Sequence, residues 1–155
     1  MNYLYFDSSA LAKRYYEEIG TDFVDELCKQ ENIAIVISDI TLAELGSAFA
    51  RKLREGNITE NEYIIMLDNL MKGYLKEYVR IAINFGILVL ATHLAKKNSL
   101  RAYDSVQLAC AMNFREMIAL KEPESNIAFV VADYTLEKAA LEEDFKTINP
   151  NFGII

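Results

Sequence analysis

The segment YLYFDSSAL at residues 3–11 places an aspartate, Asp7, directly after a short apolar run. Residues 3–6 have the length and the aromatic and aliphatic composition of a buried strand. A short helix carrying Leu11 and Tyr15 is expected to follow. Because this change from strand to helix recurs along the chain, the segment predicts a sheet whose strands are linked by helices.

The rest of the chain alternates short β-rich runs with longer helical periods. Further strands are expected at residues 33–37, 78–83, 127–131 and 145–148. Further helices are expected around residues 23–27, 40–54, 60–72, 84–97, 102–117 and 134–141. Strands separated by helices pair in parallel through right-handed crossovers. The sequence therefore predicts an α/β fold, a three-layer α/β/α sandwich with a mainly parallel sheet of about five strands, in which residues 1–155 form one domain.

Local signals mark several helix ends. Thr59 and Glu62 form a T-x-x-E capping box, so a helix should begin at residue 60. Gly56 is expected to end the preceding helix, and Asn98 is expected to stop a later one in the left-handed conformation.

Composition and charge narrow the class of protein. Hydrophobic residues make up 52% of the 155 residues and charged residues 25%, which indicates a packed core rather than disorder. No apolar run reaches the roughly 20 residues of a membrane helix, and the N-terminus lacks a secretory signal pattern, so we expect a cytoplasmic protein without a membrane span. Cys28 and Cys110 lie in apolar helical patterns and are expected to be reduced packing residues.

The net charge of −7 weighs against binding nucleic acid by general electrostatics, since phosphate binding usually leaves a basic footprint. It does not exclude an enzyme whose acidic site is neutralised by bound cations.

Four acidic residues fall where such a fold keeps its ligands. Asp7 follows the first strand and Asp133 follows the fourth, and ligands bind at the carboxyl ends of parallel strands. Glu44 lies in the helix after the second strand, among small or apolar neighbours. Asp104 lies in the first turn of its helix, where anions are favoured. Singly, the aspartates could cap or begin helices, and Glu44 could be an exposed or ion-paired residue.

As a group, these acids indicate a cation site. Two carboxylates at about 4 Å repel by roughly 4 kcal/mol at an effective dielectric constant near 20, so a fold that gathers four needs protons or cations. Mg²⁺ and Mn²⁺ prefer such oxygen ligands. The sequence has no His/Cys cluster suited to zinc, and its one histidine, His93, lies in a helix beside lysines. It also lacks a Ser–His–Asp or Cys–His set, which favours hydrolysis by a metal-activated water.

Four segments also carry a family resemblance. They are DSSALAK at 7–13, SDITLAELGSAFARK at 38–52, LRAYDSVQLACA at 100–111 and FVVADYTLEKAA at 129–140. In this order they resemble the motifs of the PIN-domain family, especially the VapC-like ribonuclease toxins of type II toxin–antitoxin systems. The third segment is the most specific, and together the segments span nearly the whole chain. Tyr134 departs from the more polar residue expected after the last aspartate.

The resemblance implies a PIN fold and Mg²⁺- or Mn²⁺-dependent cleavage of single-stranded RNA or an RNA loop. It implies that Asp7, Glu44 and Asp104 are the core metal ligands, and that Asp133 holds a second metal or acts through water. Ser9 would be a hydroxyl near the metal site, or else a helix-start hydrogen-bonding group. The resemblance further implies a homodimer and a cognate antitoxin.

Basic residues near these motifs are candidates for contacts with RNA or with the antitoxin. They are Lys13, Arg14 and Arg51. Each could instead be a solvated residue on a helix face, and Arg51 differs from the others in lying on the same helix face as Glu44.

Two other functions remain open on the sequence. The chain could be a non-catalytic PIN-like module that binds a protein partner. It could also be a phosphoaspartyl phosphatase or receiver using Asp7, although a phosphatase of that type would have a D-x-D motif and residue 9 is serine.

Overall fold

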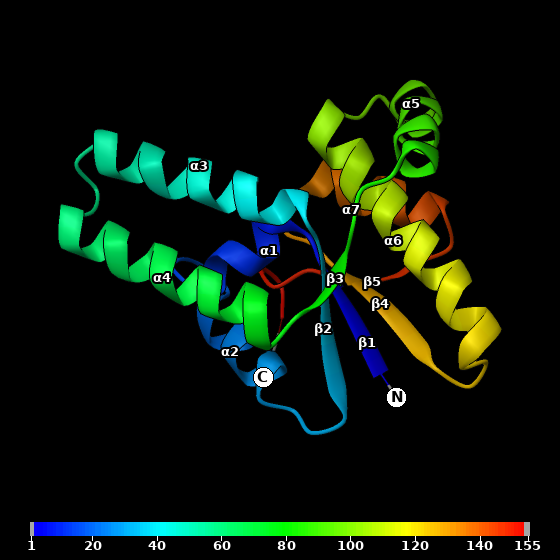
Figure 1. Cartoon of the computed structure of the whole chain (residues 1–155), viewed down its shortest axis with the longest axis horizontal. Helices are drawn as coiled ribbons and strands as arrows, with labels where there is room; N and C mark the ends of the chain where they lie inside the picture. Colours follow the sequence, from blue (N-terminus) through cyan, green and yellow to red (C-terminus); the bar gives the residue numbers. More distant parts are fainter. Residues whose placement is uncertain (1, 154–155) are drawn as a thin grey trace.

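The computed structural model describes residues 2–153, whose five strands form one all-parallel sheet with helices on both faces (Figure 1). The strand order is β3-β2-β1-β4-β5, so β1 is central and is hydrogen-bonded to β2 and β4. The strands are β1 Asn2–Phe6, β2 Ile33–Ser38, β3 Val79–Ile81, β4 Asn126–Val130 and β5 Lys146–Ile148. The expected α/β sandwich is confirmed.

Alternation along β1 divides the core into two layers. Tyr3 and Tyr5 pack on one face of the sheet and Leu4 and Phe6 on the other, because successive strand residues point to opposite faces. The face with Leu4 and Phe6 is covered by α1 Ser8–Leu11, the 3₁₀ turn Ala12–Arg14, α2 Thr21–Cys28, α3 Ile40–Arg54 and α4 Glu60–Lys76. The opposite face is covered by α5 Phe85–Asn98, α6 Ala102–Lys121 and α7 Tyr134–Glu142.

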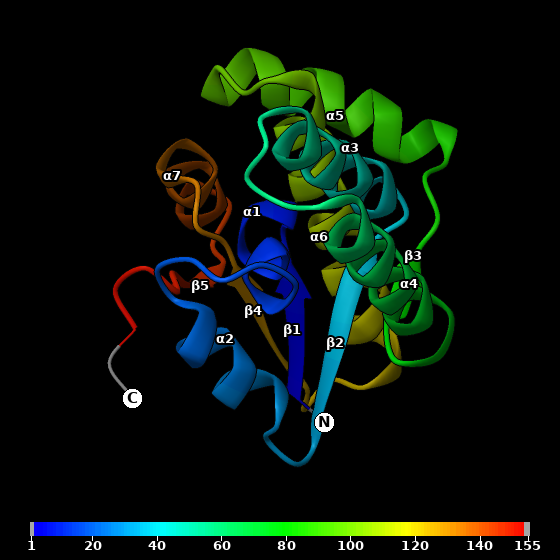
Figure 2. The ribbon, with the colours of Figure 1, turned by 90° about the vertical axis from the view of Figure 1, so that its left-hand side faces the viewer.

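The two views show where the carboxyl ends of the strands lead. In Figure 1 and Figure 2, β1 runs from the N-terminus toward α1, and α3 and α5 lie toward the same end of the sheet. None of the helices within residues 2–153 is long and apolar enough to cross a membrane. Cys28 and Cys110 are both free thiols, as expected.

The predicted element order is confirmed, and most differences lie at element ends. The capping box at Thr59 and the left-handed Gly56 (φ +73°) are present. The prediction for Asn98 is wrong by one residue, since α5 continues through it and Ser99 takes the left-handed conformation. At the edge of the sheet, β3 is shorter than predicted because only three of its residues pair with β2.

Helices α4 and α6 are longer than predicted, each extending about one turn further. In α4 the additional turn includes Gly73. A Cβ at residue 73 would lie 2.8 Å from the Tyr78 ring and 2.9 Å from the Tyr15 hydroxyl, so glycine allows two tyrosines to approach the helix. In α6, the buried Ile118 continues the apolar face past the predicted end.

Candidate active site

Asp7 lies at the point where the central strand ends and α1 begins. It is the N-cap of α1, and its Oδ2 accepts a hydrogen bond from the Ser9 N–H at 2.8 Å. The side chain is buried, with 3% of the residue's surface exposed. Burial raises the pKa of Asp7 to about 6, the hydrogen bonds from Ser9 oppose this rise, and the charge of Asp104 adds to it.

Glu44 projects from α3 and is held by a chain of hydrogen bonds through the protein interior. The Gln107 amide of α6 donates to Glu44 Oε2 at 2.5 Å and to Thr41 Oγ1 at 3.0 Å. Its carbonyl oxygen accepts a bond from the Tyr5 hydroxyl at 2.8 Å. Burial raises the pKa of Glu44 to about 7, helped by the charges of Asp7 and Asp104 and opposed by the Gln107 bond.

Gln107 was not predicted from the sequence as a site residue. Its position gave a signal, because it lies three residues after Asp104 and so on the same face of α6. A buried glutamine needs polar partners, and here these partners are Tyr5, Thr41 and Glu44.

Asp104 and Asp133 lie at the starts of α6 and α7 and share one arginine. Asp133 caps α7 by accepting a bond from the Leu136 N–H at 2.9 Å. Arg101 lies between the two acids, with its Nε 3.2 Å from Asp104 and an Nη 3.5 Å from Asp133. The pKa of Asp104 is raised, chiefly by burial, although Arg101 opposes the rise. Because the Arg101 side chain is 81% exposed, water screens this ion pair and weakens it.

Ser9 fixes the backbone beside Asp133. Its Oγ accepts hydrogen bonds from the Ala132 N–H at 3.0 Å and the Asp133 N–H at 3.2 Å. This joins the start of α1 to the loop between β4 and α7. Ser9 therefore lies close to the acids, and its hydroxyl positions the chain that carries Asp133.

The four acids line a single cleft of about 550 Å³ at the carboxyl edge of the sheet, named here the acidic cleft. Every sequence-predicted acid is thus brought to one place by a different element: Asp7 by β1, Glu44 by α3, Asp104 by α6 and Asp133 by the end of β4. Mutual repulsion among them contributes to the raised pKa values of Asp7, Glu44 and Asp104.

The three predicted basic contacts have different surroundings. Lys13 lines the acidic cleft but is buried, and its Nζ donates to the Ile19 carbonyl at 2.7 Å. Arg51 also lines the cleft. Arg14 is not among the residues lining the cleft, because its guanidinium is directed to Glu77, at 2.9 Å, and to the Tyr78 hydroxyl.

The acidic cleft fits a divalent cation by donor chemistry. It supplies carboxylate oxygens, which are the ligands that Mg²⁺ and Mn²⁺ prefer. Burial and mutual repulsion disfavour the ionised form of Asp7, Glu44 and Asp104, and a bound cation would offset this effect. As the side chains stand, no three His, Cys, Asp or Glu residues within 2–153 are grouped closely enough to hold one ion. Arg101 lies between two of the acids, and Gln107 holds a third. Cation binding would therefore require these side chains to move.

Solved structures with the same fold come from several bacteria. FitAcB from Neisseria gonorrhoeae matches with a TM-score of 0.63 at 16% identity, covering 97% of this chain and 99% of that one. VapBC2 from Rickettsia felis, bound to a DNA fragment from its promoter, matches with a TM-score of 0.58 at 16% identity over 96% and 98% of the two chains. VapBC-1 from nontypeable Haemophilus influenzae matches with a TM-score of 0.58 at 15% identity over 97% and 98%.

The sequence matches no protein-family model, and a search of curated proteins finds no significant match. At identities this low, likeness to solved structures establishes the fold alone. The chain therefore has the PIN-type fold of VapC-like proteins, as its motifs predicted. Its activity has to be argued from the acidic cleft.

Proposed function

We propose that this protein is a Mg²⁺- or Mn²⁺-dependent endoribonuclease, built as one PIN-like domain. The observation that carries the proposal is the acidic cleft, in which four carboxylates from four separate elements line one cavity. A fold has no structural need to gather acids that raise one another's pKa, whereas a cation site for phosphodiester hydrolysis needs this arrangement.

Each acid has a role in this proposal. Asp7, Glu44 and Asp104 would hold the cation, and Asp133 would hold a second one or act through water. When bound, the cation lowers the pKa of a water molecule and stabilises the charge that develops on the phosphate and the leaving oxygen. Without a cation, Gln107 holds Glu44 through a 2.5 Å hydrogen bond.

The proposed reaction is hydrolysis. The water oxygen loses a proton to solvent and forms a bond to phosphorus, the bond to the 3′ oxygen breaks, and that oxygen leaves with a proton taken from solvent. The products are a 5′-phosphate and a 3′-hydroxyl. A 2′,3′-cyclic phosphate product would contradict this chemistry, because it requires attack by the ribose hydroxyl instead of water.

Cleavage of labelled single-stranded and hairpin RNAs, with Mg²⁺, Mn²⁺ or EDTA, tests the proposal. Asp104→Asn, purified identically, should lose activity by about a thousandfold or more, since a lost ligand removes several kcal/mol of transition-state stabilisation. Asparagine retains the shape of the side chain, so the variant should still fold. Equal cleavage by both preparations would mean a contaminating nuclease and would count against the proposal.

We also propose a cognate antitoxin as the protein partner and a homodimer as the free state, which would make this protein a toxin. The proposal of an antitoxin rests on likeness to chains from the FitAcB and VapBC structures. Exposed apolar residues on α4 (Ile64, Ile65 and Leu75) and on α5 (Phe85) agree with burial by other chains. Light scattering of the purified protein, alone and co-expressed with the product of the neighbouring gene, tests both.

A non-catalytic binding module and a phosphoaspartyl enzyme remain alternatives. The second lacks the D-x-D motif of such phosphatases, because Ser9 stands where the second aspartate would be. Labelling of Asp7 by beryllium fluoride would revive that reading.

A further inference from the structure

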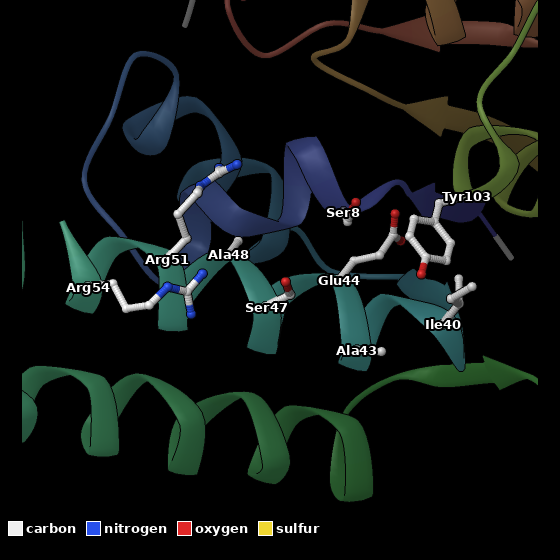
Figure 3. Close-up of a pocket in the computed structure, with 9 residues that line it drawn as sticks. All are labelled: Ser8, Ile40, Ala43, Glu44, Ser47, Ala48, Arg51, Arg54 and Tyr103. Atoms are coloured by element: carbon white, nitrogen blue, oxygen red, sulfur yellow. The ribbon is translucent and has the colours of Figure 1, made fainter.

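A second hollow continues from the acidic cleft along α3. It has a volume of about 340 Å³, and we name it the side groove, defined by Glu44, Ser47, Arg51, Arg54 and Tyr103. Figure 3 shows the Glu44 carboxylate beside the Tyr103 ring at one end and the two arginines at the other. Glu44, Arg51 and Tyr103 also line the acidic cleft, so the two hollows are continuous.

Tyr103 is an exposed aromatic residue that the packing of the core does not require. Its side chain belongs to α6, directly before Asp104, and 61% of the residue's surface is exposed. Within residues 2–153 its hydroxyl makes no hydrogen bond to another residue, whereas the buried Tyr3, Tyr5 and Tyr78 hydroxyls all do. An unengaged aromatic ring at the rim of a phosphate-processing cleft is suited to stacking on a nucleobase.

Arg51 and Arg54 are the arginines left without partners. Within residues 2–153 neither makes a salt bridge, a side-chain hydrogen bond or a cation–π contact. The other four arginines of the chain are engaged: Arg14 with Glu77, Arg80 over the Tyr74 ring, Arg101 with Asp104 and Arg115 with the Glu143 carbonyl. In a chain of net charge −7, two free guanidinium groups facing one groove are suited to binding phosphate.

We propose that the side groove binds an unpaired nucleotide of the RNA beside the scissile phosphate, with its base stacked on Tyr103 and its flanking phosphates on Arg51 and Arg54. Arg51 lies seven residues after Glu44 on α3, about 10 Å along the helix axis, which is on the scale of a nucleotide. A base in a duplex is covered on both faces, so only a single-stranded segment can offer one to Tyr103. The identity of the polymer rests on the proposed ribonuclease function.

Fluorescence anisotropy with a short labelled single-stranded RNA in EDTA tests the site without any cleavage. Tyr103→Ala should weaken binding by about 5- to 150-fold, the range found for loss of one stacked base, while Tyr103→Phe should stay near wild type. Tyr134→Ala is the matched control, because Tyr134 is also exposed and follows an acid of the cleft but does not line the side groove. With an RNA that is abasic throughout, Tyr103→Ala and wild type should bind alike.

The contribution of Arg51 and Arg54 can be measured separately, through the salt dependence of RNA binding. The double variant Arg51→Gln/Arg54→Gln should weaken binding and lower the slope of log affinity against log salt by about 1.4, since each phosphate contact on a single strand contributes about 0.7. The variant Lys72→Gln/Lys76→Gln removes the same charge from exposed residues of α4 and should change the slope much less.

Tyr103→Ala binding like wild type, a weakened Tyr103→Phe, or no binding by wild type would each overturn the side-groove proposal. Cleavage in Mn²⁺ reports on the ribonuclease independently. RNA binding that depends on Tyr103, without any cleavage, would support the side-groove proposal and contradict the ribonuclease proposal. Cleavage with binding indifferent to Tyr103 would do the reverse.

Discussion

Two groups of ionisable residues, each with buried and partly exposed members, differ in how their polar groups are satisfied. The first, named here the tyrosine cluster, consists of Arg14, Tyr15, Glu77 and Tyr78. The Tyr15 and Tyr78 hydroxyls are 2.5 Å apart, and the Arg14 guanidinium donates to Tyr78 at 2.7 Å and to Glu77 at 2.9 Å. The second is the acidic cleft, in which Asp7, Glu44, Asp104 and Asp133 lie close to one another.

The comparison distinguishes polar residues that are compatible with a stable fold from polar residues that destabilise it. The tyrosine cluster brings its own counter-charge, and each of its hydroxyls and charged groups has a partner, so its burial is compatible with stability. The acidic cleft is also lined by Glu18 and by four basic residues, Lys13, Arg51, Lys52 and Arg101. Within residues 2–153, none of these basic residues forms a salt bridge with Asp7 or Glu44. A fold keeps carboxylates without a paired charge where a ligand supplies that charge.

The largest expected effect is stabilisation of the metal-free protein by Asp7→Asn. The pKa of Asp7 rises from 3.8 to about 6 on folding, and a shift of about 2 units corresponds to about 3 kcal/mol. Because the folded-state pKa is the higher one, the wild type has its full stability from this group below about pH 4 and loses it as pH rises through about 6. The asparagine side chain of the variant can still accept the hydrogen bond from the Ser9 N–H.

Urea unfolding of both proteins in EDTA measures this difference across pH. At about pH 8, Asp7→Asn should be more stable than wild type by about 3 kcal/mol, and near pH 4 the two should be similar. An Asp7→Asn variant that is equally or less stable than wild type at about pH 8 would show that ionised Asp7 does not destabilise the fold.

A smaller effect of opposite sign is expected in the tyrosine cluster. Gly73→Ala would place a Cβ 2.8 Å from the Tyr78 ring, and such overpacking should cost about 2 kcal/mol after the gain in helix propensity. Gly46→Ala on α3 is the matched control, because nothing lies within 4 Å of its added Cβ. That control should be stabilised by about 0.5–1 kcal/mol.

The rate of RNA cleavage should also distinguish the tyrosine cluster from the acidic cleft. Gly73→Ala should cleave RNA at the wild-type rate per folded molecule, because the tyrosine cluster supports the fold and does not line the acidic cleft. A large loss of cleavage at unchanged fold content would contradict the distinction between the clusters.

The smallest effect is expected from Arg101→Gln. Its guanidinium partly neutralises Asp104 and Asp133, so its removal should tighten Mn²⁺ binding a few-fold, in keeping with an exposed pair worth less than about 1 kcal/mol. Calorimetric titration against Lys121→Gln, the same charge change at the far end of α6, measures this. If Arg101→Gln binds Mn²⁺ no more tightly than wild type does, Arg101 does not compete with the cation.

Much of the fold could be predicted because local signals and periodicity agree along this chain. The bounds of α3 were predicted to the residue, since its apolar periodicity and Gly56 point to the same end. The end of α4 was predicted about one turn too early, and the close approach of Tyr15 and Tyr78 to Gly73 near this end is a tertiary feature that local sequence does not show. Ends set by pairing, as in β3, cannot be found from local sequence.

The acids of the site could also be placed in advance, because the carboxyl edge of a parallel sheet collects whatever follows each strand. What the sequence did not show was how they are held. The Tyr5–Gln107–Glu44 chain joins residues far apart in sequence, and the pairing of Arg14 with Glu77 depends on where α4 ends. Such contacts follow from packing rather than from motif spacing.

The effect of Mn²⁺ on unfolding tests the central claim most directly, with wild type compared with Asp7→Asn/Glu44→Gln at neutral pH. If the acidic cleft is a cation site, Mn²⁺ should stabilise wild type by about 2.7 kcal/mol at a hundredfold excess over Kd and leave the double variant almost unchanged. An equal shift in both proteins would mean that Mn²⁺ binds elsewhere. No shift in wild type would contradict the cation site and leave a protein-binding module as the better account.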